Sequence, residues 1–272
     1  MPELPEVETT RRGLEPHLLG RRIASVTVRD ARLRWPVERE LAGRITGQRI
    51  RALRRRAKYL IIELERDALI VHLGMSGALS LAPAHTRAGK HDHFELALDT
   101  GTVLRLTDPR RFGSVHRVSG PPEAHMLLAS LGPEPLSAQF DAEWLYRITR
   151  GRRASIKETL MNSRVVAGVG NIYANEALFR AGIHPRTPAG RLSRQRCAAL
   201  VDAVRETLAD AIAAGGSSLR DWRHADGGLG YFQQRYFVYD RADAGCRTCG
   251  SPIRGIRQGQ RATYYCPRCQ RR

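Results

Sequence analysis

The first six residues, MPELPE, carry the most unusual chemistry in the sequence. If Met1 is removed, Pro2 becomes a secondary amine at the start of the chain, followed by the carboxylates of Glu3 and Glu6. A terminal amine titrates near neutrality, so part of it is unprotonated and nucleophilic at pH 7. The sequence therefore offers an amine nucleophile with two carboxylates close behind it.

The same residues are also those expected at the start of a helix. Proline is favoured in the first turn because its missing N–H costs nothing there, and Glu side chains suit the positive end of the helix dipole. Val7, Leu14 and Leu18 then continue at helical spacing. On this segment alone the structural interpretation is favoured, and the rest of the chain must decide between the two.

Composition favours a polyanionic partner. The 272 residues include 45 basic and 27 acidic side chains, for a net charge of +18, and such a field is most often used to bind nucleic acid. The length suggests two domains, each able to bury a core. The sequence has neither a signal peptide nor an apolar run of membrane-spanning length, so we expect an intracellular protein with no membrane partner.

Nearly all of the basic residues are arginines. Lysine occurs only at positions 58, 90 and 157. Because the chain uses Arg wherever a positive charge is enough, each remaining Lys is a candidate for a specific role, although chance survival explains any one of them equally well.

A β-rich region follows the first helix. Short runs of alternating apolar residues with turn residues between them predict strands, and strands at this spacing are typical of a sandwich or a barrel. The segment Asp99 to Gly101 predicts a hairpin turn. The expected strand segments are Ile23 to Arg29, Arg49 to Glu65, Ala68 to Leu81, Phe94 to Leu98 and Val103 to Leu106.

Two polar clusters lie within this region. The cationic run from Arg54 to Lys58 could simply protect a sheet edge, and the run from Lys90 to His93 could bind a metal through its His-x-His pair. No third metal ligand is obvious near His91 and His93. The overall charge favours phosphate contacts for both clusters.

The pattern becomes helical after a Gly- and Pro-rich junction between Gly120 and Pro135. Glycines between Val165 and Asn171 allow a backbone to approach a phosphate closely, with Asn171 and the next helix N-terminus as donors. The expected helices are Glu143 to Thr149, Ser155 to Met161, Ile172 to Ala181 and Ser193 to Ala214.

Two enzyme classes can be excluded from these motifs. Tyr173 stands where a dinucleotide-binding fingerprint requires its third glycine. The run from Gly74 to Gly77 lacks the spacing of a G-x-S-x-G nucleophile elbow. A Gly-rich segment from Gly215 to Tyr231 is equally consistent with a surface loop and with a lid over a site.

Four cysteines near the C-terminus have the spacing of a four-thiolate zinc site. Cys246 and Cys249 form one pair, and 16 residues later Cys266 and Cys269 form another. All four positions are protein ligands, so we expect one structural Zn²⁺ with no open position for water. Cys197 lies outside this pattern. Arginines 254, 257 and 261 make the segment between the pairs cationic.

Several motifs together resemble the formamidopyrimidine-DNA glycosylases, bacterial base-excision enzymes for oxidised purines. They are PELPEVE at the start, RRAKYL from Arg55, HLGMSG from His72, KHDH from Lys90, DPRRFG from Asp108, VVAGVGNIYANE from Val165 and the four-cysteine finger. Individually several are weak, but in this order they are highly specific, and they cover the chain from end to end.

The resemblance implies a multi-domain α+β fold. An N-terminal catalytic β-sandwich with its leading helix would span 1–130, a helix–two-turn–helix domain with the lid loop 135–240, and a zinc finger 241–272. DNA would lie in the cleft between them. We expect double-stranded DNA containing an oxidised purine or an abasic site as partner, a monomeric protein, and a cytoplasmic location associated with the nucleoid through DNA.

The resemblance also assigns catalytic roles. Pro2 would attack C1′ of the damaged nucleotide, expel the base and form an iminium, after which β,δ-elimination would cut the strand on both sides. Glu3 would transfer a proton at the sugar, and Glu6 would hold the N-terminal region in place at the DNA. Lys58 and Arg261 join Pro2 and Glu3 in the expected catalytic set.

The remaining matches concern DNA. Lys58, His91, Asn171 and Arg261 match the positions that bind phosphates around the flipped nucleotide. Further DNA contacts are expected from Lys157, Tyr173 and Arg220. Met75, Arg110 and Phe112 match the residues that fill the gap in the duplex, Arg110 at the orphaned cytosine and Phe112 as a wedge, which offsets part of the unstacking cost.

Two positions depart from the family pattern, and two other functions stay open. Asn162 stands where Asp is expected, and Arg220 occupies a loop position that is often Lys and that bears on base selectivity. One alternative is an endonuclease VIII-like glycosylase for oxidised pyrimidines. The other is a non-catalytic zinc-finger protein that binds DNA.

Overall fold

The computed structural model describes residues 1–217 and 231–272. The described chain forms two compact units. Unit 1 contains Met1–Ala129 together with residues 214–217 and 231. Unit 2 contains Ser130–Ala213 and Phe232–Arg272. Among the described residues, no helix is both long enough and apolar enough to cross a membrane.

Helix α1 (Leu4–Leu18) opens unit 1 and confirms the helix expected at the N-terminus. Glu3 is its N-cap and forms a capping box with Glu6, in which each side chain accepts a hydrogen bond from the backbone N–H of the other residue. Its buried face, which includes Val7, Leu14 and Leu18, faces the core of unit 1. The helix start and the carboxylates behind Pro2 are therefore parts of one structure.

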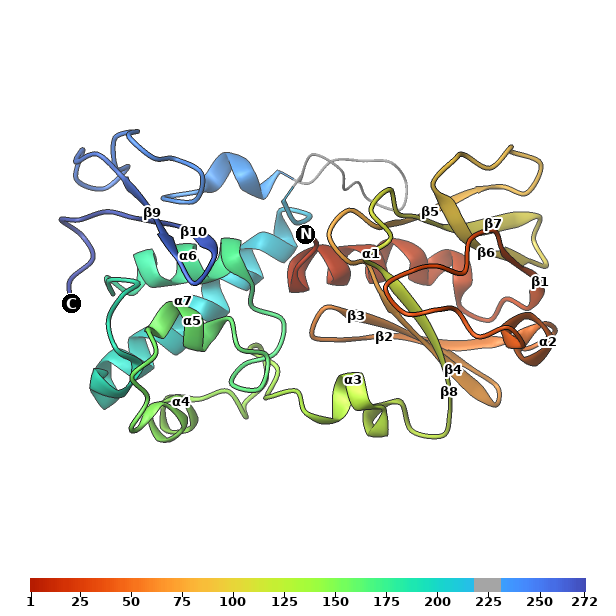
Figure 1. Ribbon diagram of the computed structural model, residues 1–272, viewed down its shortest axis with the longest axis horizontal. Helices are drawn as coiled ribbons and strands as arrows, with labels where there is room; N and C mark the ends of the chain where they lie inside the picture. The colour runs from red at the N-terminus through yellow and green to blue at the C-terminus, as the bar shows by residue number, and fades with distance from the viewer. Residues whose placement is uncertain (218–230) are drawn as a thin grey trace. The chain divides into compact units, whose positions relative to one another are not determined.

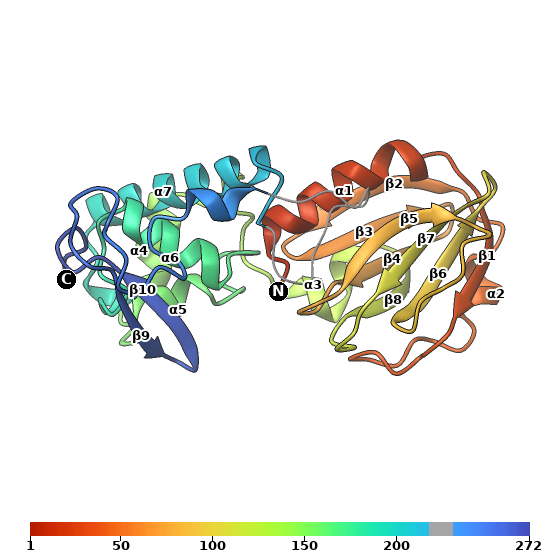
Figure 2. The same cartoon turned by 90° about the horizontal axis from the view of Figure 1, so that it is seen from above.

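Two antiparallel four-stranded sheets form most of the described part of unit 1, in the orders β1-β6-β7-β5 and β2-β3-β4-β8. Their apolar side chains and those of α1 form one continuous hydrophobic core. The two sheets lie one above the other in Figure 1 and overlap in the view from above in Figure 2. The expected β-sandwich is confirmed. The strands are β1 (Ile23–Val28), β2 (Ile50–Arg56), β3 (Tyr59–Leu64), β4 (Asp67–His72), β5 (Ala78–Pro83), β6 (Asp92–Leu98), β7 (Thr102–Thr107) and β8 (Ser114–Ser119).

The strand boundaries differ from the sequence expectation at three places. The segment from Arg49 to Glu65 contains two strands joined at Ala57 and Lys58, and the segment from Ala68 to Leu81 also contains two. β8 was not expected, because its sequence, SVHRVS, has little apolar content. The described residues of unit 1 also include the short helices α2 (Leu41–Ile45), η1 (Pro122–Ala124) and α3 (Met126–Ala129).

Unit 2 is built around the long helix α7, against which α4 and α6 pack (Figure 1). Asp141 and Ser155 cap α4 and α5 by accepting hydrogen bonds from backbone N–H groups. All four predicted helices are present, with boundaries within two residues of those expected. They are α4 (Ala142–Thr149), α5 (Ile156–Leu160), α6 (Asn171–Arg180) and α7 (Arg194–Ala213), with 3₁₀ turns η2 (Ala189–Arg191) and η3 (Phe232–Arg235).

A small hairpin of β9 (Arg254–Gln258) and β10 (Arg261–Tyr265) ends the chain. Its core is small: Phe179 of α6, Val238 and Ile253 are buried with two cysteine side chains. Such a core cannot stabilise a module of this size alone, so a further cross-link is expected there.

Candidate functional site

The N-terminal residues of unit 1 are held by the side chain of Glu6. This carboxylate is fully buried, and its Oε2 accepts a hydrogen bond from the backbone N–H of Glu3 at 2.8 Å. Its Oε1 accepts one from the N–H of Ser217, also at 2.8 Å. Pro2 and Glu3 are buried as well. The side chain of Glu6 thus links the backbone of Glu3 to that of Ser217.

Gly216 packs directly against Glu6. A Cβ at this position would lie 3.2 Å from Oε1 of Glu6, and the backbone has a φ of +78°, which disfavours other residues. The segment before the undescribed residues is therefore fixed to the start of the chain. Arg220, which we expected to bind DNA, lies outside the described residues.

Lys58 stands in the two-residue turn between β2 and β3. Arg56 pairs with Tyr59 across the hairpin, and Ala57 between them adopts a φ of +53°. Few residues other than glycine adopt this left-handed conformation. In a residue with a Cβ it is less stable than the right-handed conformation by about 1 kcal/mol, because the Cβ comes too close to the following carbonyl oxygen. Ala57 is buried and Lys58 is half-buried. Lys58 is therefore held in a tight turn, directly after a residue with a restricted backbone conformation.

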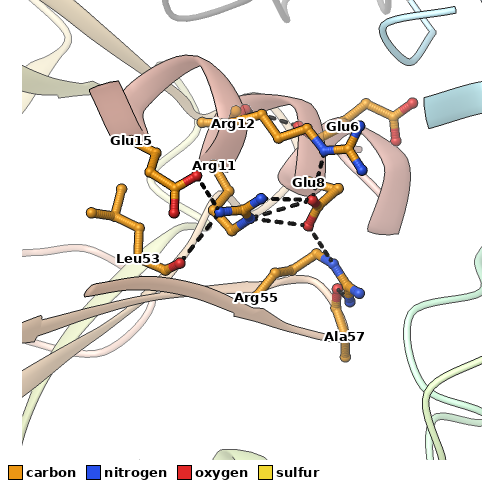
Figure 3. Close-up of polar contacts among 9 residues, drawn as sticks. Glu6, Glu8, Arg11, Arg12, Glu15, Leu53, Arg55 and Ala57 are labelled. Atoms are coloured by element: carbon orange, nitrogen blue, oxygen red, sulfur yellow. Dashed lines mark hydrogen bonds and ion pairs between the residues drawn. The ribbon is translucent and has the colours of Figure 1, made fainter. Parts of the chain in front are cut away.

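A cluster of charges connects α1 to this turn (Figure 3). Oε2 of Glu8 accepts a hydrogen bond from Nε of Arg55 at 3.2 Å, and Nη1 of Arg55 donates to the carbonyl of Ala57 at 3.1 Å. Glu8 also pairs with Arg11 and Arg12 at 3.0 and 2.8 Å. Burial acts to raise the pKa of Glu8, but these arginines outweigh it, so its pKa lies below the usual value. Glu8 lies within the PELPEVE motif, yet sequence reasoning gave it no role.

His72, at the end of β4, stays neutral in this environment. Its Nδ1 accepts a hydrogen bond from the N–H of Gly74 at 3.0 Å, and its ring lies 4.9 Å from that of Tyr59. Burial lowers the pKa of His72 to about 4, and the nearby charges of Lys58 and Arg34 act in the same direction. The histidine can therefore accept a hydrogen bond near neutral pH.

Asp108 connects the loops that carry Met75, Arg110 and Phe112, which are expected to fill the gap in the DNA duplex. It is fully buried, and its two carboxylate oxygens accept hydrogen bonds from Ser76 Oγ at 2.8 Å and from the N–H of Gly113 at 2.7 Å. Its own N–H donates to the carbonyl of His91 at 2.9 Å. This role was not predicted from the sequence, although Asp108 opens the DPRRFG motif.

The turn after β4 and the loop before β8 pack closely together. A Cβ on Gly74, whose φ is +63°, would lie 2.4 Å from the carbonyl carbon of Phe112, so only glycine fits there. Phe112 is 39% exposed, and the guanidinium carbon of exposed Arg110 lies 4.9 Å from its ring centre. Met75 and His91 are half-buried. The structure thus brings Met75, Arg110 and Phe112 onto adjoining loops.

In unit 2, two of the residues expected to contact DNA, Asn171 and Lys157, bond to the same backbone carbonyl. The carbonyl of Ala262 accepts hydrogen bonds from Nδ2 of Asn171 and from Nζ of Lys157, both at 3.0 Å. Nζ of Lys157 also donates to Oγ1 of Thr263 at 2.7 Å. These bonds fix β10 beside Arg261, which is exposed.

Two of the residues expected to contact DNA are buried in the structure. Lys157 is 1% exposed, and its ammonium is turned into the unit, so it supports β10 and presents no charge at the surface. Tyr173 is also 1% exposed, and its ring packs 5.7 Å from that of Phe232. Both side chains therefore pack inside unit 2, where Lys157 supports β10 and Tyr173 packs against Phe232.

Sequence reasoning also missed Glu176, the last residue of the VVAGVGNIYANE motif. Its buried carboxylate accepts hydrogen bonds from the backbone N–H groups of Phe237, Val238 and Tyr239, at 2.8 to 3.0 Å. Burial raises its pKa, and these bonds oppose that effect. Glu176 thereby anchors the backbone that leads into the finger. Asn162, by contrast, is exposed, and its Oδ1 accepts a hydrogen bond from the N–H of Arg164.

The four cysteine sulfurs have the arrangement of a metal site. All four sulfurs lie within 4.8 Å of one another, and the pairs Cys246–Cys269 and Cys249–Cys266 are 3.9 and 3.5 Å apart. Tetrahedral coordination with bonds of about 2.3 Å requires separations of about 3.8 Å, so a metal ion fits. Within residues 1–217 and 231–272 this is the group that could hold a metal, and His91 and His93 do not form another.

Backbone groups also turn toward these sulfurs. The N–H of Thr248 points to the sulfur of Cys246, and the N–H of Cys269 to that of Cys266, each at 3.4 Å. Such contacts stabilise thiolates and are usual around structural metal ions. All four ligands come from the chain, so the site suits a structural ion.

The described residues thus combine a β-sandwich, a helical unit built around α7 and a finger whose four cysteines could hold a metal ion. Residues 1–115 match the formamidopyrimidine-DNA glycosylase N-terminal domain, residues 131–222 the H2TH domain of the same family, and residues 246–272 the zinc finger found in FPG and IleRS. The formamidopyrimidine-DNA glycosylase of Thioalkalivibrio sulfidiphilus is 57% identical, and that of Stutzerimonas stutzeri 58%, each over the full length of both chains. The chain therefore belongs to the formamidopyrimidine-DNA glycosylase family.

Solved structures agree with this assignment. The MutM (Fpg) protein of Thermus thermophilus is 40% identical, with a TM-score of 0.89, covering 99% of this chain and 98% of that one. The Lactococcus lactis Fpg, in complex with DNA containing an abasic site, is 35% identical, with a TM-score of 0.92 over both full chains. A mutant of the same enzyme has been solved with DNA containing Fapy-dG.

Proposed function

We propose that this chain is a bifunctional DNA glycosylase and abasic-site lyase of base-excision repair that removes oxidised purines, namely 8-oxoguanine and formamidopyrimidines. The observation that carries the proposal is the N-terminus: directly behind Pro2, Glu3 caps helix α1, and its backbone N–H donates to the buried carboxylate of Glu6. A secondary amine in a fixed position suits covalent catalysis at a sugar carbon. The Lactococcus relative binds Fapy-dG and abasic DNA, which supports the substrate class.

The proposed reaction begins once Met1 has been removed. The lone pair of the Pro2 nitrogen forms a bond to C1′ while the bond from C1′ to the base breaks, and the base departs with that electron pair and takes up a proton. The nitrogen loses its proton, and Glu3 protonates the ring oxygen as the C1′–O4′ bond opens. An iminium between Pro2 and C1′ results.

The iminium makes strand cleavage possible on the same intermediate. It acidifies the C2′–H bond, so removal of that proton expels the 3′ phosphate, and a second elimination expels the 5′ phosphate. Water then releases the sugar fragment from Pro2. A glycosylase that activates water would remove the base without cutting the backbone.

The other expected residues receive roles in DNA binding. Lys58, His91, Asn171 and Arg261 would bind phosphates around the flipped nucleotide, with Lys58 and Arg261 also assisting catalysis by their charge. Met75, Arg110 and Phe112 would fill the space left in the duplex, since side chains inserted there offset part of the unstacking cost.

The four-cysteine site would hold one structural Zn²⁺. Zinc prefers four thiolates in a tetrahedron, and when bound it would supply only the cross-link that the small core of the finger needs. Cys246, Cys249, Cys266 and Cys269 would hold it, and the hairpin they support carries Arg261.

Borohydride trapping tests the mechanism. Reduction of the iminium should give a stable protein–DNA adduct on duplex DNA containing 8-oxoguanine, provided that Met1 has been removed. A Pro2→Gly variant with a blocked N-terminus should form no adduct and cut no strand. Processed protein that cleaves this DNA without giving an adduct would overturn the proposal.

One observation supports oxidised pyrimidines as a second candidate substrate class. The wild-type Lactococcus relative has also been solved with DNA containing an oxidised pyrimidine. Comparing excision of 8-oxoguanine with that of thymine glycol separates the two classes. Faster excision of 8-oxoguanine is expected, whereas a preference for thymine glycol would favour an endonuclease VIII-like enzyme. A protein that bound DNA but cut neither substrate would be a non-catalytic binder.

A further inference from the structure

The proposed reaction depends on two groups that belong to different elements of unit 1. The amine of Pro2 precedes α1, whereas Lys58 stands in the turn between β2 and β3. Both groups must meet one nucleotide, so the helix and the hairpin have to keep a fixed relation to each other. A displacement of about 1 Å in such an arrangement can lower a rate by on the order of 100-fold.

The Glu8–Arg55 pair spans the two elements. Glu8 lies on the second turn of α1, and Arg55 is the penultimate residue of β2. Their side chains are only 13% and 11% exposed, with Glu8 Oε2 at 3.2 Å from Arg55 Nε. Exposed ion pairs on protein surfaces contribute little to stability, but a shielded pair holds its geometry more firmly.

Arg55 extends this connection to the residue before Lys58. Its Nη1 donates to the carbonyl of Ala57 at 3.1 Å, so one guanidinium group joins the helix carboxylate to the turn (Figure 3). Ala57 has the unfavourable φ of +53°, and a bond to its carbonyl helps to keep that conformation. Since Lys58 follows directly, the direction of its side chain depends on this peptide.

We infer that Glu8 and Arg55 are positioning residues for the lyase chemistry, which set Lys58 relative to the amine of Pro2 through the carbonyl of Ala57. The inference rests on the proposed function. Neither side chain needs to touch the DNA for this role. The planar fork of arginine is essential because two of its nitrogens act at once, and lysine cannot reproduce both bonds.

Two conservative variants test the inference. Glu8→Gln keeps the size of the side chain and removes its charge, and Arg55→Lys keeps the charge and removes the fork. The rate of borohydride-trapped adduct formation is measured in a single turnover with enzyme in excess, on duplex DNA containing 8-oxoguanine. Affinity is measured separately on DNA containing a tetrahydrofuran abasic analogue, which cannot form the iminium.

Matched controls come from the same two elements. Glu15→Gln removes an equivalent charge from α1, where Glu15 pairs with Arg11 at 2.9 Å. Arg51→Lys alters an arginine of β2 that pairs with Glu65 at 3.1 Å. Neither control residue bonds to Ala57 or pairs with Glu8 in these contacts, so both variants should keep the wild-type rate.

We expect Glu8→Gln and Arg55→Lys to lower the single-turnover rate by at least about 10-fold while changing the dissociation constant by less than about twofold. A purely structural role would instead lower affinity, rate and melting temperature together. Rates within twofold of wild type for Arg55→Lys would overturn the inference, even if Glu8→Gln did not fold. If wild-type protein gave no adduct at all, the proposed function itself would fail, which is a different result.

Discussion

At the scale of single residues, buried carboxylates organise the candidate site, and each of them accepts hydrogen bonds from several donors. Glu6 fixes the N-terminal residues, Asp108 fixes two loops, and Glu176 fixes the backbone that leads to the finger. A buried carboxylate is costly unless such donors compensate for lost water. Sequence reasoning identified Glu6 but overlooked the other two, because the donors of Asp108 and Glu176 are mostly groups distant in sequence.

The neutral state of His72 gives a testable dependence on pH. Its pKa is about 4 in the folded protein, against about 6.5 for an unperturbed histidine. Between these values the unfolded chain binds more protons, so the free energy of unfolding falls as the pH drops from about 7 toward 4. The loss from this residue should be at most about 3 kcal/mol.

Urea denaturation at a series of pH values checks this prediction. The control is His72→Gln, whose amide oxygen can accept the hydrogen bond from Gly74 but has no proton to gain. Wild type should lose more stability than the variant on acidification through this window. Parallel curves for the two proteins would show that His72 does not govern the effect.

At the scale of elements, the sequence predicted the types correctly where periodicity was strong. The helices from α4 to α7 and the leading helix agree because apolar residues recur at helical spacing and residues such as Ser155 mark their starts. The β2–β3 turn was missed because neither of its residues, Ala57 and Lys58, is Gly or Pro. Alanine rarely adopts the left-handed conformation that Ala57 has here, so nothing in the sequence indicated it. The inward direction of Lys157 was equally invisible, since one lysine on a short helix has no periodic signal.

The placement of Lys157 predicts how two variants will differ. Lys157→Met should remove the bonds to Ala262 and Thr263, lower stability by about 1–3 kcal/mol and weaken DNA binding indirectly. Because the ammonium is buried, the slope of log affinity against log salt should stay as in wild type. Arg261→Ala should instead lower that slope by about one, as expected when an exposed phosphate contact is lost.

Binding titrations at several salt concentrations provide the measurement, with thermal unfolding alongside. A reduced slope for Lys157→Met would contradict the buried role and restore a direct phosphate contact. An unchanged slope for Arg261→Ala would remove Arg261 from the proposed phosphate contacts.

At the scale of the whole molecule, the net charge and the positioned loop residues have different roles in binding DNA. The net charge of +18 favours any polyanion, whereas the selective groups occupy a few loops and turns within each of two compact units. Unit 1 owes its stability to a large apolar core shared by two sheets and α1. The finger of unit 2 has only a few buried side chains besides its cysteines. The two units should therefore respond differently to loss of a metal.

Removing the metal should unfold the finger and spare the sandwich. Without a metal nothing cross-links the four cysteine sulfurs, and the small core around Phe179 and Ile253 cannot hold the finger folded alone. After chelation, DNA affinity should fall by more than about 10-fold, because Arg261 loses its support, while amide exchange in β2, β3, β4 and β8 stays slow.

Cys249→Ala should reproduce the loss of metal. Cys197→Ala is the matched control, since Cys197 is buried outside the cluster, and it should keep one metal ion per chain. Chelated protein that bound DNA as tightly as before would show that the finger does not carry the proposed contact.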